Sequence, residues 1–299
     1  MVDIKRGAEP EGFRQNAEHT LFVEGGNDNA IDPEVLKLLL KNIPIQIKAM
    51  GPSSHIRSVA EALHKHHPHY YFLVDRDHHH TQMVEKCWES FPSPDTCNLL
   101  IWRRKELENY FLIPDYLSKC DYMQVEEDEL QQFILQEASR RVYLDAANMV
   151  IIGLREDLKK QWIKIFSNTQ LFTSKDAALN QLLTCAEFPQ HVSHVSKKLH
   201  KDEIVQRFET ILQLFFGSQK ALAYSHGSWL EMISGKEILN SVINHCFQVK
   251  GVRRILQGDE ARKEVIKDLL RLPLNEQPDD FQELHSLISK QTISPPTYF

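Results

Sequence analysis

Apolar positions follow two different periods along the chain, and the pattern changes near residue 126. Before residue 115, short apolar runs at 20–23, 43–50, 70–74 and 98–102 have the length and composition of strands. Between these runs, residues 33–41 and 54–67 carry apolar side chains at the spacing of a helix face. Strands that alternate with helices predict parallel βα units and therefore an α/β sheet.

The first of these helices carries a start signal. Asp32 stands directly before Pro33, and aspartate is a favoured N-cap residue. Proline is common at the first helical position, because its missing N–H would have no partner there. The pair therefore predicts that Asp32 caps a helix whose first residue is Pro33.

Beyond residue 126 the chain has a helical pattern. Apolar residues recur at helical spacing from Leu130 to Val150, and residues 176–185 and 202–216 also read as helices. We expect a helical insertion or second subdomain here. A further helix is predicted over residues 237–247, and two more near 259–271 and 279–290 form a helical C-terminal segment.

Composition limits the classes of protein that fit. The chain has 299 residues and a formal charge of −6, so it is not basic overall, although local basic patches can still contact phosphates. Its five cysteines show no paired spacing, and the first residues carry no secretory signal. No apolar run is long enough to cross a membrane. These features favour a cytoplasmic protein in a reducing environment.

Acidic residues follow two of the predicted strands. Glu24, followed by two glycines, ends the first strand, and Asp75 and Asp77 follow the third. Parallel strands end at one edge of the sheet, where open α/β folds bind ligands. Asp75 and Asp77 should point the same way and Arg76 elsewhere, since extended residues alternate. Asp28 would share a face with Glu24 if that segment were helical.

Carboxylates that converge without cations repel one another, and a divalent cation removes that conflict. Oxygen ligands suit Mg²⁺ or Mn²⁺, and two such ions can flank a scissile phosphate. An Asp-x-Asp motif alone is often only a solvated loop. The glycines after Glu24 add weight, because they let the backbone turn sharply beside a ligand.

Two segments resemble a known signature. Leu21-Phe-Val-Glu-Gly25 with Asp28, and Leu73-Val-Asp-Arg-Asp77, are similar to the TOPRIM motifs of topoisomerases, primases and OLD-type nucleases. The segments Arg104-Lys-Glu-Leu-Glu-Asn-Tyr110 and Ile233-Ser-Gly-Lys-Glu237 narrow the resemblance to small TOPRIM proteins that work with ABC-type ATPases. The nearest such family is AriB, the effector of the PARIS anti-phage defence system.

The resemblance implies a role for each matching residue. Glu24 would be a metal ligand and general acid or base, Asp28 would support the same metal, and Asp75 and Asp77 would be further ligands. Glu108 best matches the later acidic ligand, and Glu106 is its rival.

The resemblance also gives Lys236 a role, as the lysine that approaches the scissile phosphate. Ser234 could cap the helix that begins there, whose free N–H groups favour phosphate. A solvated lysine at a helix start is the plain alternative. For Glu106 and Glu108 the alternative is a pair of surface carboxylates that form ion pairs with the basic run 103–105. That basic run could instead bind nucleic-acid backbone.

The implied fold is a TOPRIM parallel-sheet core with a helical insertion and a helical C-terminal segment. The core would occupy residues 1–120 and be completed by 223–255, with the insertion at 121–222 and C-terminal helices at 256–299. The implied protein is a Mg²⁺-dependent nuclease with two ions that acts as a toxic antiviral effector. An AriA-like ABC-type ATPase would hold it until infection, and it would then cleave tRNA as a homodimer.

Two alternatives remain open at this stage. An OLD-type DNA nuclease would use the same carboxylates, and no residue pattern here recognises a 2′-hydroxyl. A catalytically inactive subunit that only regulates its ATPase partner belongs to a different class of protein. The several acidic residues argue against it, since an inactive site has no physical need to hold them together.

Overall fold

The computed structural model describes residues 19–27, 30–77, 79–159, 168–171, 173–251 and 254–293. Its sheet has four parallel strands in the order β2-β1-β3-β4, which confirms the α/β class and the parallel sheet. The strands are β1 (His19–Val23), β2 (Ile45–Ala49), β3 (Tyr70–Val74) and β4 (Leu99–Ile101). Strands β2, β3 and β4 lie within predicted apolar runs, and β1 begins one residue before its predicted run.

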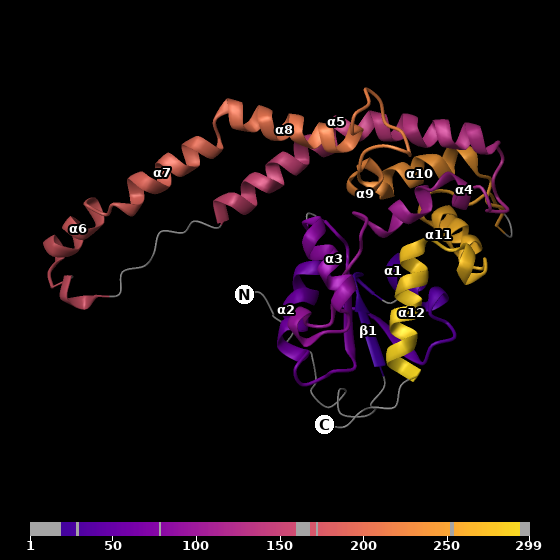
Figure 1. The fold of residues 1–299 in the computed structure, drawn as a ribbon, viewed down its shortest axis with the longest axis horizontal. Coiled ribbons are helices and arrows are strands. Elements are labelled where there is room, and N and C mark those ends of the chain that lie inside the picture. The colour runs from indigo at the N-terminus through magenta and orange to yellow at the C-terminus, as the bar shows by residue number, and fades with distance from the viewer. Residues whose placement is uncertain are drawn as a thin grey trace. The chain divides into compact units, whose positions relative to one another are not determined.

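The connections leave the sheet on both faces. The chain passes from β1 to β2 through α1 (Ile31–Leu39), and reaches β3 through α2 (Ser53–Leu63) and β4 through α3 (Thr81–Ser90). Figure 1 shows α2 and α3 on one side of the strands and α1 on the other. The strand order therefore reverses between the neighbouring strands β1 and β3, and such a switch point is where open α/β sheets bind ligands.

The start of α1 differs from the prediction. The carbonyl of Ala30 accepts the first helical bond, from the N–H of Glu34 at 3.2 Å, so Ala30 is the N-cap. Asp32 lies in the first turn instead, and the expectation that it caps the helix was wrong. The chain turns into the helix earlier because the N–H of Ala30 bonds back to the carbonyl of Asn27. Asp32 is thereby left available for other contacts.

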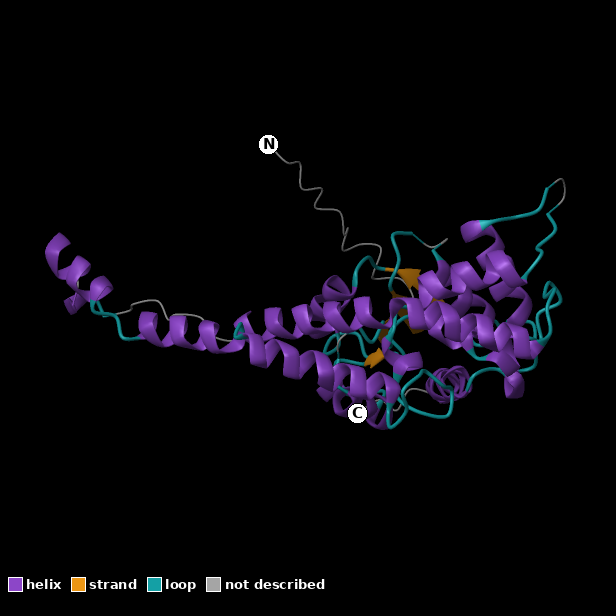
Figure 2. Cartoon of the chain, turned by 90° about the horizontal axis from the view of Figure 1, so that it is seen from above, coloured by secondary structure: helices purple, strands orange, loops and turns teal. Residues whose placement is uncertain are grey.

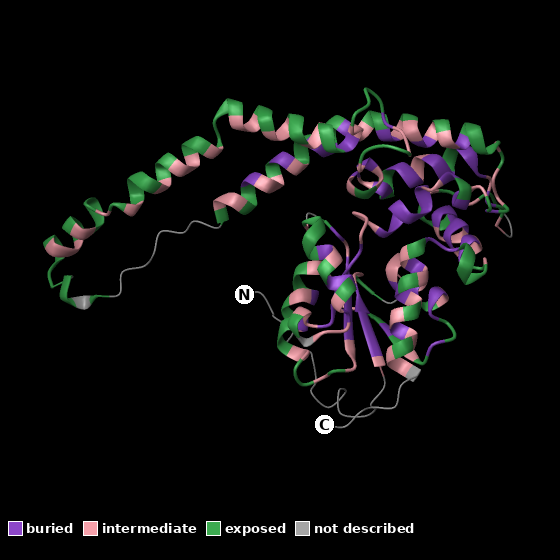
Figure 3. Cartoon of the chain, viewed as in Figure 1, coloured by how far each residue is buried: buried purple, intermediate pink, exposed green. Residues whose placement is uncertain are grey.

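A first compact unit contains the sheet and combines the described residues up to Glu137 with those from Leu230 onward. Strands β1, β3 and β4 form its core and are almost fully buried, whereas the edge strand β2 exposes Gln46 and Lys48 (Figure 3). After β4 the unit adds the short helices η3 (Leu107–Leu112) and α4 (Pro114–Leu117), then most of α9 (Trp229–Met232), α10 (Gly235–Cys246), α11 (Gly258–Leu269) and α12 (Asp279–Ile293). The ring of Phe281 on α12 packs against Trp102 and Tyr110, with ring centroids 5.6 and 5.0 Å apart.

The second compact unit, Ala138–Trp229, is helical in its described residues (Figure 2). It holds most of α5 (Glu127–Lys159), together with α6 (Lys175–Leu183), α7 (Glu187–Lys198) and α8 (Lys201–Phe216). Arg207 on α8 joins this helix to α5 through Asp157, at 2.7 Å. Neither α6 nor α7 buries a single residue, as Figure 3 also shows.

All five cysteines are free thiols. Among the described helices, none combines the length and apolar character needed to cross a membrane.

Candidate functional site

The carboxyl ends of β1 and β3 bring two predicted residues together. Val23 and Leu73 are partners in the parallel register. Glu24 directly follows Val23 and Asp75 lies two residues after Leu73, so both leave the sheet at the same edge. The Glu24 carboxylate accepts a hydrogen bond from the N–H of Asp75 at 2.9 Å. Burial raises the pKa of Glu24, and the charge of Asp77 raises it further, while hydrogen bonds from the backbone partly oppose the shift.

The surroundings of the Asp75 carboxylate are unfavourable for its negative charge. Burial raises its pKa well above the ordinary value, and the charges of Asp32, Glu24 and Glu108 act in the same direction. Its Oδ1 atom is buried and, within the described residues, has no hydrogen-bond partner. A buried acceptor without a partner is uncommon in folded proteins and calls for an explanation.

Arg76 points away from these carboxylates as predicted. At Asp77 the backbone leaves the extended conformation, although the charge of Asp77 still acts on Glu24 and Asp75. The Arg76 guanidinium turns away from the carboxylates and donates to the carbonyl of Arg103 at 2.6 Å and to Thr81 at 2.8 Å. Asp77 has a φ of 45°, so the backbone turns there instead of continuing as a strand. Its exposed carboxylate accepts a hydrogen bond from Ser53 at 3.2 Å.

Asp32 joins the site, although the sequence analysis missed it. Burial and the charges of Glu108 and Glu24 raise its pKa from 3.8 to about 8, and Lys236 opposes the shift. Three carboxylates thus interact across segments that are far apart in the sequence. The missed signal was an acid eight residues after Glu24, which the capping pattern before Pro33 seemed to explain. Hereafter Glu24, Asp32, Asp75 and Glu108 are called the carboxylate cluster.

The structure separates the two candidates for the later acid. Glu108 is 8 % exposed and acts electrostatically on both Asp32 and Asp75, so it belongs to the cluster. Glu106 instead accepts hydrogen bonds from the hydroxyl of Ser234 at 2.9 Å and from the N–H of Lys236 at 2.8 Å. It therefore caps the amino end of α10.

This cap corrects the expectation for Ser234. Ser234 does occupy the N-cap position of α10, but its side chain accepts no hydrogen bond from the helix. Its hydroxyl donates to Glu106, whose charged oxygens are the stronger acceptors for the helix N–H. The exposed side chain of Lys236, at the start of this helix, acts electrostatically on Asp32 and Glu108.

Asn109 and Gly235 explain how a distant segment reaches the site. The fully buried Asn109 amide donates to the carbonyls of Leu230 and Ile233, both at 2.9 Å, and its oxygen accepts from the N–H of Glu106. A side chain on Gly235 would overlap this amide. The Glu-Leu-Glu-Asn and Ser-Gly-Lys segments therefore fit one another as a pair.

The basic run 103–105 is occupied with internal contacts. Arg103 forms ion pairs with Asp280 and Glu283, both at 2.7 Å, and with Glu85 at 3.1 Å. Arg104 lies over the ring of Tyr110 and donates to the carbonyl of Asn109. These ion pairs give Arg103 a structural role within the first compact unit.

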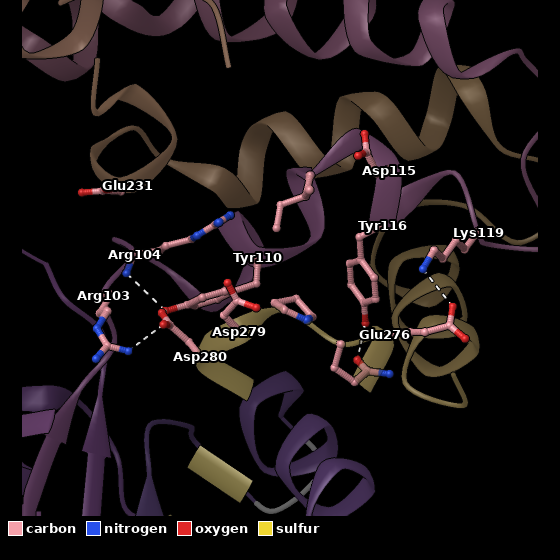
Figure 4. A pocket seen from close by; sticks show the side chains of 13 residues that line it. Arg103, Arg104, Tyr110, Asp115, Tyr116, Lys119, Glu231, Glu276, Asp279 and Asp280 are labelled. Atoms are coloured by element: carbon pink, nitrogen blue, oxygen red, sulfur yellow. Dashed lines mark hydrogen bonds and ion pairs between the residues drawn. The ribbon is translucent and has the colours of Figure 1, made fainter. Parts of the chain in front are cut away.

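Arg103 and Arg104 also line a pocket of about 390 Å³ near the start of α12 (Figure 4). The close-up shows Arg103 directed at Asp280, and Lys119 directed at Glu276 on the far side. The oppositely charged groups of this pocket largely form ion pairs with one another. It is therefore a weaker candidate for chemistry than the carboxylate cluster.

Two observations bear on metal binding. In the part of the chain that the structure describes, no three histidine, cysteine, aspartate or glutamate side chains stand close enough together to hold a metal ion. Asp28, which the sequence predicts as a ligand, lies outside the described residues. The members of the cluster thus interact through their charges without forming a closed set of ligands.

Comparisons with protein-family models, with curated proteins and with solved structures find no match for this chain. The geometry of the site therefore has to be interpreted on its own terms.

Replacing Gly235 by alanine should destabilise the junction with Asn109. The added methyl group must displace a buried amide that makes three hydrogen bonds, so the free energy of unfolding should fall by about 1–3 kcal/mol. Urea denaturation measures the change. Gly26→Ala is the matched control, because a methyl group there meets no atom of the described residues within 4 Å. Equal stabilities of the two variants would contradict this account of the junction.

Asp32→Asn should change how the stability of the metal-free protein depends on pH. The folded protein holds the Asp32 proton up to about pH 8, whereas the unfolded chain loses it near pH 4. The stability from that proton is therefore present at low pH and is lost as pH rises from about 4 to 8. The variant should melt at nearly the parent's temperature at pH 4 and above it at pH 8.

Thermal melts in chelator at several pH values test this expectation. Asp115→Asn, a replacement at an exposed position outside the cluster, is the control. A difference between Asp32→Asn and the parent that stays constant from pH 4 to pH 8 would show that Asp32 does not carry the proton.

Proposed function

We propose that this protein is a divalent-metal-dependent nuclease that hydrolyses phosphodiester bonds. One observation carries the proposal: the carboxylate cluster gathers at the switch point of a parallel sheet, with the ammonium group of Lys236 within its electrostatic reach. Such a gathering of like charges costs free energy, and proteins retain this arrangement mainly at functional sites.

The donor atoms of the carboxylate cluster suit Mg²⁺ or Mn²⁺, and binding would draw the carboxylates together into a closed set of ligands. Carboxylate oxygens are the ligands that these hard cations prefer. Among the described residues the buried Oδ1 of Asp75 has no hydrogen-bond partner, so a cation could fill that role. Glu24, Asp32, Asp75 and Glu108 would hold the metal, and the sequence adds Asp28. When bound, two such ions supply activation of water and stabilisation of the leaving oxygen.

Side chains of this protein would bind the substrate and transfer the proton. Lys236 is exposed at the start of α10, where its ammonium group can hold a phosphate oxygen. The raised pKa of Glu24 brings this carboxyl group nearer to the range in which it can accept and return a proton at neutral pH. Asp77, held by Ser53, faces solvent beside them, where a substrate strand can approach.

The finer assignment rests on the resemblance of the motif segments. We propose a TOPRIM nuclease of the AriB type, a cytoplasmic antiviral effector that is held by an ABC-type ATPase and cleaves tRNA as a homodimer. Two features support this assignment. The Glu24 and Asp75-Arg-Asp77 segments follow neighbouring parallel strands, and the Ser-Gly-Lys segment packs against the Glu-Leu-Glu-Asn segment.

Asp75→Asn should abolish cleavage while keeping the fold. The purified protein is incubated with total tRNA and, separately, with plasmid DNA, in Mg²⁺ or in chelator. We expect tRNA cleavage in Mg²⁺ only, and a loss of at least about a hundredfold in Asp75→Asn. The variant should melt slightly above the parent in chelator, since repulsion within the cluster is relieved.

Glu276→Gln is the control for this assay, because Glu276 is an exposed carboxylate that pairs with Lys119 away from the cluster. Cleavage that persists in chelator or in Asp75→Asn would overturn the proposed site. Cleavage of plasmid alone would replace tRNA by DNA as the substrate. A protein that cleaves neither and binds no metal would support the regulatory alternative.

A further inference from the structure

Arg262 on α11 is a buried arginine beside the carboxylate cluster. Only 2 % of the residue is exposed, and its guanidinium lies 3.6 Å from the Oε1 atom of Glu108. Burying a guanidinium group costs several kcal/mol unless partners compensate its charge, so arginine is rarely buried without a specific reason. The position of Arg262 therefore needs an explanation beyond packing.

The partners of Arg262 differ in their surroundings. The Glu108 side chain is 10 % exposed, so this ion pair lies in a region where charges interact strongly. Asp259, at 3.0 Å, is 75 % exposed, and water weakens that pair. Glu108 is thus the partner with which Arg262 interacts most strongly, although the distance to Asp259 is shorter.

Arg262 also contacts the helix that carries Lys236. Its guanidinium donates to the side-chain oxygen of Asn240 on α10 at 3.1 Å. Asn240 lies four residues after Lys236, so the two occupy the same face of α10. The guanidinium group of Arg262 therefore contacts both Glu108, the member of the carboxylate cluster on η3, and the face of α10 that carries Lys236.

We propose that Arg262 is a positioning residue, which fixes the direction of the Glu108 carboxylate so that it can serve as a metal ligand. This inference rests on the proposed metal-dependent function. The distance of 3.6 Å is that of an ion pair and not of a short hydrogen bond, so the guanidinium can orient the carboxylate without replacing a metal as its main partner. Residues that orient metal ligands typically change metal affinity 10- to 100-fold.

The test is a double-mutant cycle on Mn²⁺ affinity, measured by titration of the full chain. Arg262→Met should weaken Mn²⁺ binding by about 10- to 100-fold. In a Glu108→Gln background the same substitution should have almost no further effect, because the ligand that it positions is gone. Arg262→Lys should give an intermediate loss, since lysine keeps the charge but lacks the planar fork.

Arg271→Met is the matched control, because Arg271 follows α11 and is 71 % exposed with Asp268 as its partner. Circular dichroism establishes which variants fold, and if Arg262→Met does not fold, Arg262→Lys carries the cycle. If Arg262 only repelled the metal ion, its removal would instead tighten Mn²⁺ binding.

Three outcomes would overturn the inference. They are tighter binding in Arg262→Met, an affinity equal to that of the parent, and a full additional loss in the Glu108→Gln background. If the parent itself binds no Mn²⁺, the proposed function fails and this inference fails with it. The affinity of the parent therefore distinguishes the two failures.

Discussion

Mutual repulsion among the carboxylates at the switch point is the constraint on which the site depends. Glu24 and Asp75 follow neighbouring strands, so the parallel register alone forces them together. Asp32 and Glu108 then add charge from α1 and from the segment after β4. Burial is the largest cause that raises the pKa values of all four, and for Asp32 and Asp75 the charges of other cluster members raise them further.

The chain compensates this repulsion with groups from distant segments. Asn109 fixes the segment that leads into α10, and Glu106 caps that helix, so the ammonium group of Lys236 is held near Asp32. Arg262 approaches Glu108 from α11. Lys236 and Arg262 both follow the second compact unit in the sequence. The first compact unit therefore needs segments from both ends of the chain to balance the charges of the carboxylate cluster.

Local patterns predict only part of this arrangement. The four strands follow from apolar runs, and the shared position of Glu24 and Asp75 follows from parallel topology, because both depend on features visible within short segments. Asp32 was missed because a neighbouring proline offered a sufficient local explanation for it. The exchange of roles between Ser234 and Glu106 could not be predicted, since it depends on two segments that meet only in the folded chain.

The net negative charge of the site affects how a substrate could approach it. With all side chains ionised, the carboxylate cluster and Asp77 carry more negative charge than Lys236 and Arg262 can offset. A phosphodiester would add another negative charge and would be repelled from this edge of the sheet. Binding of an anionic substrate therefore requires further positive charge, and a site of oxygen ligands takes up such charge most readily as divalent cations. Metal binding would then be a condition for substrate binding as well as for chemistry.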